Sequence, residues 1–354
     1  MSWDGKYPNI YIGTDPEVFV RDDNGLLPAF KFLPPKENAE TFYSKWANAR
    51  VFWDGFQAEF GCTANCCIAY TVDSVRDGLR GTLELARKNS PTAKLTLQNV
   101  FQIPAKTLRL EKEEHVLLGC NPSQNAYGML GEHVLNARKL RYRFAGGHLH
   151  LGIASQKYNP KELESFVRFL DSTLGVWSVG AAASFDKPLR RKYYGLAGEY
   201  RTPEHGLEYR TLSNFWLAHP GLANLVMMFT RALHGAFQYG GVKEWVAHPQ
   251  EVVEIINNSD VRKARKLLEL NQKMLTKVFS SATYGYLLTN PENSPNIQQG
   301  IRIGFEGLES VIPTPEDFEL NWKLDEARTG EWKCHCDGKM ESWKDLCQSI
   351  PKAA

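Results

Sequence analysis

The sequence predicts an α+β fold, in which an antiparallel sheet carries helices on one face and leaves its other face open. The order of the expected elements (strand, helix, strand, helix and then paired strands) favours this arrangement. Five strand-like runs also carry polar residues two positions apart, and such residues point to the same face of a strand. With 354 residues, 43% of them hydrophobic and 12% aromatic, the chain can build a packed core in one large domain or two.

In the first part of the chain we expect two strands and a helix. The first strand-like run covers residues 10–20 and ends at a hairpin-type turn signal in residues 21–25. A loop that starts at the proline pair 34–35 precedes the second strand, residues 51–61. Residues 72–88 then carry apolar side chains at helical spacing, and we expect this helix to cover the apolar face of the sheet.

The second part of the chain has clear helix signals. Asn159 is a capping residue, Pro160 occupies the first turn, and Glu162 follows the cap by three positions. Further helices are expected at residues 220–237, 250–256 and 260–278. The sequence shows no internal repeat and no low-complexity tract.

The composition changes beyond Gly307, so we predict a main domain of residues 1–307 and a C-terminal appendage of residues 308–354. A lid packed on the main domain and a partly ordered tail are both open for the appendage. Four of its residues could in principle hold zinc, although their adjacent donors are irregular for a structural zinc site. These residues are Cys334, His335, Cys336 and Cys347.

Composition argues against several classes of partner. A formal net charge of +2 gives no global field for nucleic acid, and no run approaches the roughly 20 apolar residues of a membrane span. The N-terminus lacks the apolar core of a secretion signal, and seven cysteines lack the density of a disulfide scaffold. We therefore expect a cytoplasmic protein in which Cys62, Cys66 and Cys67 are structural thiols.

The polar pairs carry the functional prediction. If their strands are neighbours, the shared face is a polar cavity, because buried carboxylates and guanidinium groups without partners cost several kcal/mol each. Carboxylates and histidines on one surface suit a divalent metal ion, and arginines beside them suit phosphate. The pairs are Asp15 with Glu17, Gln57 with Glu59, His148 with His150, Glu199 with Arg201, and Glu208 with Arg210.

Two of these pairs have informative neighbours. Asp15 and Glu17 lie between apolar runs typical of an interior strand, where carboxylates without a cation would have raised pKa values. Gly146 and Gly147 precede the histidine pair and indicate a backbone that another group approaches closely. A cupin-type iron or manganese site also uses two histidines at this spacing, but it requires a carboxylate that residues 153–156 do not supply.

A basic cluster surrounds residues 193–198. A phosphate clamp and an exposed basic loop both explain it, since arginine binds phosphate through two parallel hydrogen bonds. The sequence has no Walker A motif and no Gly-x-Gly-x-x-Gly, so a nucleotide would not be held by a P-loop or a Rossmann turn. Gly-x-Ser-x-Gly and His-Glu-x-x-His are also absent, which argues against ordinary serine hydrolases and zincins. The cluster consists of Arg190, Arg191, Lys192, Arg201 and Arg210.

Four motifs, in this order, resemble those of the phage-encoded carboxylate–amine ligases of type 2, also called amidoligases. They begin at Gly13, Asp54, Gly146 and Gly206, and their sequences are GTDPEVFV, DGFQAEF, GGHLHLG and GLEYRTLSNFW. This family belongs to the glutamine synthetase and glutamate–cysteine ligase superfamily. The resemblance covers residues 11–216 and implies a glutamine-synthetase-like domain with a curved antiparallel sheet.

The resemblance also implies a reaction and its cofactors. ATP, with Mg²⁺ or Mn²⁺, would activate a carboxylate as an acyl phosphate, which an amine then attacks. Glu17 and Glu59 would hold the metal ion nearer the acyl substrate. Asp15, His148 and Glu208 would hold the ion that bridges the ATP phosphates.

The remaining polar residues receive roles in the same way. Arg210 would contact the transferring phosphoryl group and Arg201 the other phosphates, and the phosphate clamp would add Arg190 and Arg191. His150 and Glu199 would be supporting or substrate-binding groups, and Glu199 could accept the proton that the amine loses. Arg210, Glu199 and His150 are thus the candidate catalytic residues.

Two alternatives stay open at this point. One is a kinase of the same superfamily, which would phosphorylate its substrate and stop there. The other is a non-catalytic phage scaffold or host-interaction protein. The partners of a ligase would be ATP, a carboxylate substrate and an amine substrate, such as an amino acid, a peptide or a protein. The identity of both substrates and the oligomeric state are open.

Overall fold

The antiparallel sheet that the sequence predicts is the centre of the structure. The computed structural model describes residues 10–43, 48–117, 123–129, 137–154, 158–238, 245–287, 297–326, 335–336 and 339–340. Neighbouring strands of the main sheet lie in the order β3, β2, β6, β1, β11, β13, β12 and β9, and all of these pairs are antiparallel. Their bounds are β1 (Tyr11–Thr14), β2 (Glu17–Asp22), β3 (Gly25–Leu27), β6 (Gln57–Asn65), β9 (Gln124–Asn125), β11 (Leu149–Gly152), β12 (Glu199–Arg201) and β13 (Gly206–Tyr209). The α+β class is confirmed.

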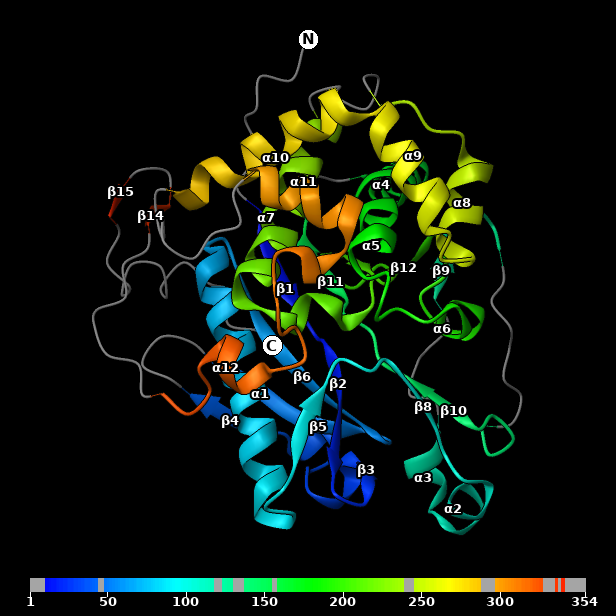
Figure 1. Ribbon diagram of the computed structural model, residues 1–354, viewed down its shortest axis with the longest axis vertical. Helices are drawn as coiled ribbons and strands as arrows, with labels where there is room; N and C mark the ends of the chain where they lie inside the picture. Colours follow the sequence, from blue (N-terminus) through cyan, green and yellow to red (C-terminus); the bar gives the residue numbers. More distant parts are fainter. Residues whose placement is uncertain are drawn as a thin grey trace.

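Shorter strands extend and flank this sheet. β5 (Asn48–Asp54) pairs with β6 and with β4 (Glu40–Tyr43), and β7 (Lys94–Thr96) pairs with β2. A separate ribbon of β8 (Val100–Gln102) and β10 (Tyr142–Phe144) lies near the short helices α2 (Ala105–Leu110) and α3 (Glu113–Val116) (Figure 1).

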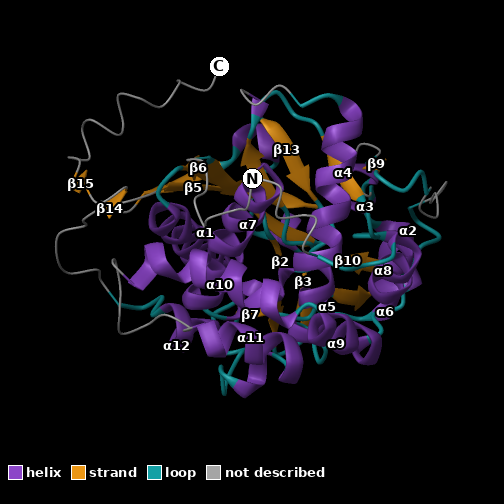
Figure 2. Cartoon of the chain, turned by 90° about the horizontal axis from the view of Figure 1, so that it is seen from above, coloured by secondary structure: helices purple, strands orange, loops and turns teal. Residues whose placement is uncertain are grey.

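Helices pack against the apolar face of the sheet. α1 (Ile68–Asn89) lies against β5 and β6, and it also contacts α7 (Pro220–Gln238) (Figures 1 and 2). The contact is close, because a Cβ atom at Gly78 of α1 would lie 2.2 Å from the Phe60 ring of β6. The buried residues of the sheet include Val18, Ala58, Leu149, Leu151 and Leu207. Among the described residues, no helix combines the length and the apolar character needed to cross a lipid bilayer.

Four of the predicted helices are present as α1, α4 (Pro160–Leu170), α7 and α8 (Pro249–Asn257), with changes at their ends. α4 has the predicted capping box, in which Asn159 and Glu162 each accept a hydrogen bond from the other's backbone N–H. α4 continues through a π-helical turn (Asp171–Gly175) into α5 (Val176–Ala181). The other helices are α6 (Pro188–Tyr193), α9 (Val261–Leu270), α10 (Gln272–Leu287), α11 (Ile297–Glu306) and α12 (Phe318–Trp322). The prediction of a single helix at residues 260–278 is therefore wrong, because Asn271 separates α9 from α10. The Asn271 side chain accepts a hydrogen bond from the N–H of Val246 and donates one to its carbonyl.

The first predicted strand, residues 10–20, is interrupted. Asp15 and Pro16 separate β1 from β2, because proline has no N–H to donate to a neighbouring strand. Both halves nevertheless pair with β6, where Thr14 lies opposite Cys62 and Glu17 lies opposite Glu59.

The second predicted strand, residues 51–61, is a hairpin instead of a single strand. The chain turns at Gly55, which has a φ of +62°, and Asp54 lies opposite Gln57. Asp followed by Gly is a strong signal for a tight hairpin turn. The turn folds β5 back along β6, so that Asp54 comes close to Glu59.

Residues 308–326 pack against the rest of the protein. Phe318 and Trp322 are buried, Trp322 Nε1 donates to the carbonyl of Leu217 (2.6 Å), and Arg76 Nε donates to the carbonyl of Trp322 (2.9 Å). Further on, only β14 (His335–Cys336) and β15 (Lys339–Met340) are described, so Cys334 and Cys347 lie outside the described residues. The domain boundary after residue 307 stays a prediction, as does the zinc alternative.

Trp322→Ala tests how strongly this segment stabilises the fold. We expect a loss of about 3–5 kcal/mol in the free energy of unfolding, because the change leaves a cavity and an unpaired carbonyl at Leu217. Leu320→Ala on the same helix is the control, since Leu320 is 63% exposed. Denaturant titration of both variants measures the difference. Equal stabilities would show that residues 318–322 are an accessory to the core.

Candidate active site

The strand registers bring the polar pairs together on the face of the sheet that the helices leave open. Glu17 of β2 lies opposite Glu59 of β6. His150 of β11 lies opposite Glu208 of β13, and Glu208 lies opposite Arg201 of β12. Directly opposite residues share a face. β1 lies between β6 and β11, and Asp15, directly after β1, lies between the two groups, which we call together the row.

Three carboxylates form the first acidic cluster, which we call the Glu17 cluster. It consists of Glu17, Asp54 and Glu59, and one carboxylate oxygen from each lies within 4.8 Å of the others. Burial raises the pKa of Glu17 to about 7, and the neighbouring Asp54 adds to the shift. Burial and the charges of Asp15 and Asp54 hold the pKa of Glu59 well above its usual range. Negative charge therefore predominates in the cluster, and Lys36 contacts it with Nζ 3.4 Å from Glu59 Oε1.

Asp54 is a member of this cluster that the strand periodicity of the sequence did not predict. Asp54 is the first residue of the second motif. The Asp54-Gly55 dipeptide is the sequence feature that could have predicted the turn and so the position of Asp54. On a single strand, five positions would have separated Asp54 from Glu59 and placed them on opposite faces. The hairpin places both on the same face.

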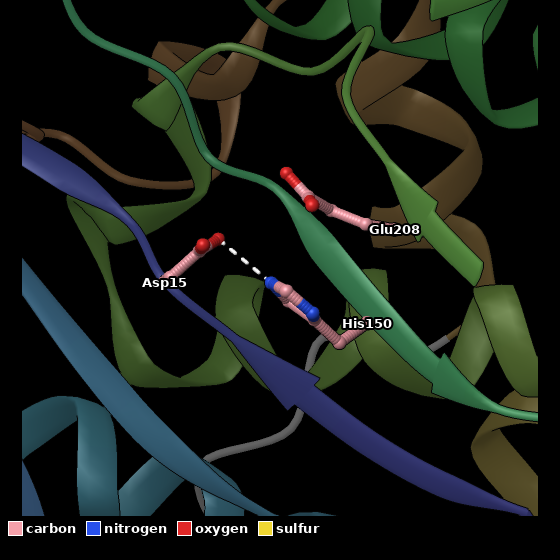
Figure 3. Close-up of side chains that lie close together, drawn as sticks. All are labelled: Asp15, His150 and Glu208. Atoms are coloured by element: carbon pink, nitrogen blue, oxygen red, sulfur yellow. Dashed lines mark ion pairs between the residues drawn. The ribbon is translucent and has the colours of Figure 1, made fainter. Parts of the chain in front are cut away.

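The second acidic cluster, the Asp15 cluster, consists of Asp15, His150 and Glu208 (Figure 3). His150 Nε2 lies 3.0 Å from Asp15 Oδ1, and Asp15 directly follows β1, the strand that pairs with β11 of His150. Burial opposes the charge of Asp15, but contacts with His150 and His148 outweigh it and hold the pKa of Asp15 well below its usual range. Likewise, Arg210 and the histidines outweigh burial and lower the pKa of Glu208. This cluster thus keeps its carboxylates ionised.

Tyr194 joins the two clusters, and no sequence periodicity marked it because it lies in a loop after α6. Its hydroxyl donates to Glu17 Oε1 (2.8 Å) and lies 2.8 Å from His148 Nε2. The other ring nitrogen of His148, Nδ1, is 3.3 Å from Asp15 Oδ1 and 3.7 Å from Glu208 Oε1. Burial and the charge of Arg210 lower the pKa of His148 to about 4, so this imidazole is neutral at pH 7.

The predicted phosphate-binding arginines divide into two groups. Arg210 forms an ion pair with Glu208, and Arg201 Nη1 lies 3.7 Å from the same carboxylate. Arg190 and Arg191 are instead buried, donate to the backbone carbonyls of residues 145, 195, 211 and 212, and pair with Asp186. These contacts give Arg190 and Arg191 a supporting position behind the Tyr194 loop, and their predicted role at phosphate stays untested.

Glu199 and His150 have defined surroundings. Glu199 Oε2 accepts a hydrogen bond from the N–H of Gly195 (2.8 Å), and burial raises the pKa of Glu199 although Arg210 opposes the shift. His150 Nδ1 lies 3.0 Å from Nε2 of His205, a residue of the turn between β12 and β13. Glu199 therefore lies among Arg210, Arg190 and Arg191, whose charges oppose the effect of burial on its pKa.

A buried carboxylate supports the row from behind. Tyr209 and Thr211 flank Arg210, and their hydroxyls donate to Asp171 Oδ1 in the π-helical turn (2.6 and 3.1 Å). Burial raises the pKa of Asp171 to about 7. Because residues 208 and 210 face the row while residues 209 and 211 are held by Asp171, the turn fixes the position of the Glu208 and Arg210 side chains.

Both acidic clusters have the donor chemistry of a divalent metal site. Carboxylates are preferred by Mg²⁺, and Mn²⁺ also accepts imidazole. Asp15 Oδ1 and His150 Nε2 are buried, yet among the described residues neither makes a hydrogen bond of good geometry. An ion between these atoms would satisfy both of them. The residues present therefore fit the metal that the sequence analysis predicts.

Residues 124–290 match the family model described as Phage phiEco32-like COOH.NH2 ligase-type 2. The matched stretch includes β11, β12 and β13, whereas Asp15 and the Glu17 cluster precede it. No curated protein matches the sequence significantly. The match confirms the resemblance to the carboxylate–amine ligase family over these residues.

Asp171→Asn tests the buried carboxylate through the pH dependence of stability. The folded protein holds the Asp171 proton up to about pH 7, whereas an ordinary aspartate releases it near 3.8. The protonated carboxyl therefore stabilises the fold at low pH, and this contribution is lost as the pH rises through about 7. We expect the stability of the wild type relative to Asp171→Asn to fall between about pH 4 and pH 7 and to level off above. A difference that does not change over this range would contradict the raised pKa.

Proposed function

We propose that this protein is an ATP- and Mg²⁺-dependent ligase with a glutamine-synthetase-like fold, since residues 124–290 match the model of a carboxylate–amine ligase family. It would join a carboxylate to an amine through an acyl phosphate. The observation that carries the proposal is the row of two acidic clusters and two arginines on one open face of the sheet. Its proposed place of action is the cytoplasm of a phage-infected cell.

The order of groups along the row suits phosphoryl transfer to a carboxylate. That step brings two anions together, so positive charge must offset their repulsion in the transition state. Mg²⁺ at the two clusters would neutralise the phosphate and carboxylate oxygens. Arg210, held by Glu208, is placed beside the Asp15 cluster to contact the transferring phosphoryl group, and Arg201 is placed to contact the remaining phosphates.

The contacts refine two of the predicted roles. His150 Nε2 belongs to the Asp15 cluster, so we propose that His150 supplies its nitrogen ligand. His148, held by Tyr194, would support it or ligate as well. Glu199 lies among arginines, so we propose it as a counter-charge for Arg210. A carboxylate of the Glu17 cluster is then better placed to accept the proton of the amine.

The proposed reaction has two steps. A substrate carboxylate oxygen attacks the γ-phosphorus of ATP, and the bond from that phosphorus to the leaving ADP oxygen breaks. The amine nitrogen then attacks the acyl carbon, the carbon–oxygen bond to phosphate breaks, and the amine loses a proton. The site must exclude water between the steps, since the acyl phosphate would otherwise hydrolyse.

Removing one carboxylate from each cluster tests the metal sites separately. We expect Glu59→Gln and Glu208→Gln each to weaken the binding of a different Mn²⁺ ion by at least about 10- to 100-fold, because each removes a charged ligand. Isothermal titration calorimetry with Mn²⁺ and no nucleotide measures this. Glu84→Gln, an exposed glutamate on α1, is the matched control. Wild-type Mn²⁺ binding by both site variants would contradict the assignment.

The reaction itself is tested by analysing all of its products. With suitable substrates, the protein should release ADP and phosphate in step with a new amide, detected by mass spectrometry. ADP with a stable phosphorylated product and no phosphate would favour the kinase alternative. AMP and pyrophosphate would exclude the acyl-phosphate route, and no turnover with any acid and amine would favour a non-catalytic protein.

Arg210→Ala separates phosphoryl transfer from metal binding in the same assay. We expect the transfer rate to fall about 100-fold or more while Mn²⁺ still binds, the scale for removal of a transition-state charge partner. Arg302→Ala is the control, because Arg302 is an exposed arginine that also pairs with a glutamate. An unchanged rate in Arg210→Ala would remove Arg210 from the chemistry.

A further inference from the structure

A cavity of about 510 Å³ opens beside the Glu17 cluster. Asp54 and Glu59 belong both to the cluster and to the cavity wall, so the two are continuous. Among the described residues, no arginine lines this cavity, whereas Arg201 lies on β12 and Arg210 just after β13. The cavity is therefore placed for a substrate other than the nucleotide.

The lining of the cavity is acidic and aromatic. Four of its residues are acidic, against one lysine, and the rings of Phe30, Phe52 and Trp53 also line it. Phe30 is stacked on His115 with ring centroids 4.0 Å apart, and Trp53 meets the same imidazole edge-on. Carboxylates together with aromatic faces attract cations, whereas an anionic substrate would be repelled here.

Lys36 already places an ammonium group in this environment. Its Nζ lies 4.8 Å from the centre of the Phe52 ring and 3.4 Å from Glu59 Oε1. The Lys36 side chain is 69% exposed, so it reaches in from the surface and can move out without disturbing the core. A positively charged nitrogen is thus accommodated next to a carboxylate of the Glu17 cluster.

The acidic residues at the rim indicate what the rest of the ligand carries. Glu37 is exposed, and the Glu114 side chain is 58% exposed, whereas Asp54 and Glu59 lie at the inner end of the cavity. A ligand with one nitrogen beside Glu59 would place its other end near these glutamates. A second positive charge there would be stabilised as well.

We propose that this cavity binds the amine substrate, and that the amine is a diamine or polyamine whose attacking nitrogen takes the position of the Lys36 ammonium. This inference rests on the proposed ligase function, because it assigns the second substrate of that reaction. Lys36 then competes with the amine and must be displaced from Phe52 and Glu59 for it to bind.

Binding of 1,5-diaminopentane to the full chain with Mg²⁺ and without ATP tests the proposal. We expect measurable binding by calorimetry, tighter binding in Lys36→Met, and binding about 5- to 30-fold weaker in Phe52→Leu, the range of a partly desolvated cation–π contact. Lys88→Met, which changes an exposed lysine on α1, is the matched control and should bind as the wild type does. Lys36→Met changes an exposed side chain, so its diamine binding can still be compared with that of the wild type if Phe52→Leu does not fold.

Glutarate, an anion of similar length, is the opposing probe. Glutarate binding that is lost in Lys36→Met would show that the cavity takes the acid, and it would overturn the proposal. Absence of diamine binding, or weaker diamine binding in Lys36→Met, would also overturn it.

The outcome is separable from that of the ligase assay. Diamine binding without any ATP-dependent amide would leave the cavity assignment standing and contradict the ligase. Amide formation that uses only uncharged amines, with no diamine binding, would support the ligase and contradict the cavity assignment.

Discussion

Everything at the open face depends on one unfavourable pairing, that of Glu17 with Glu59. The two carboxylates lie directly opposite each other on β2 and β6, and Asp54 adds a third negative charge. Like charges opposite each other destabilise a sheet, and burial increases the cost. The protein offsets this in part, because the N–H of Gly146 and the Tyr194 hydroxyl donate to Glu17 and Lys36 pairs with Glu59. Three carboxylates still face one lysine here, and a divalent ion would reduce the repulsion among them further.

The helical face of the sheet makes this arrangement possible. Strand residues alternate between the two faces, so each polar side chain in the row has apolar neighbours that pack on the other side. Leu149 and Leu151 flank His150 in this way, and Leu207 and Tyr209 flank Glu208. Hydrophobic burial thus fixes the strand register, and the register fixes the distances between the polar groups. A slip by one residue would move every polar group of that strand into the core.

The sequence alone predicted most of the row, because the period of a strand is independent of its surroundings. It predicted the α+β class, the α4 capping box and the pairs at Asp15 and Glu208. It missed Asp54 because a turn inside residues 51–61 reverses which residues share a face. It missed Tyr194 because a loop has no period. Arg190 and Arg191 were grouped with the other arginines because charge alone does not reveal which carbonyls a guanidinium group will meet.

The Tyr194 hydroxyl has a consequence for the order of events at the site. It contacts Glu17 in one cluster and His148, beside the other, so a single group takes part in the hydrogen bonding of both. A ligand that moves this hydroxyl at one cluster must change the free energy of binding at the other. By thermodynamic linkage the effect is equal in both directions. Occupancy of the two clusters is then a coupled equilibrium, and the coupling passes through one tyrosine hydroxyl in a loop.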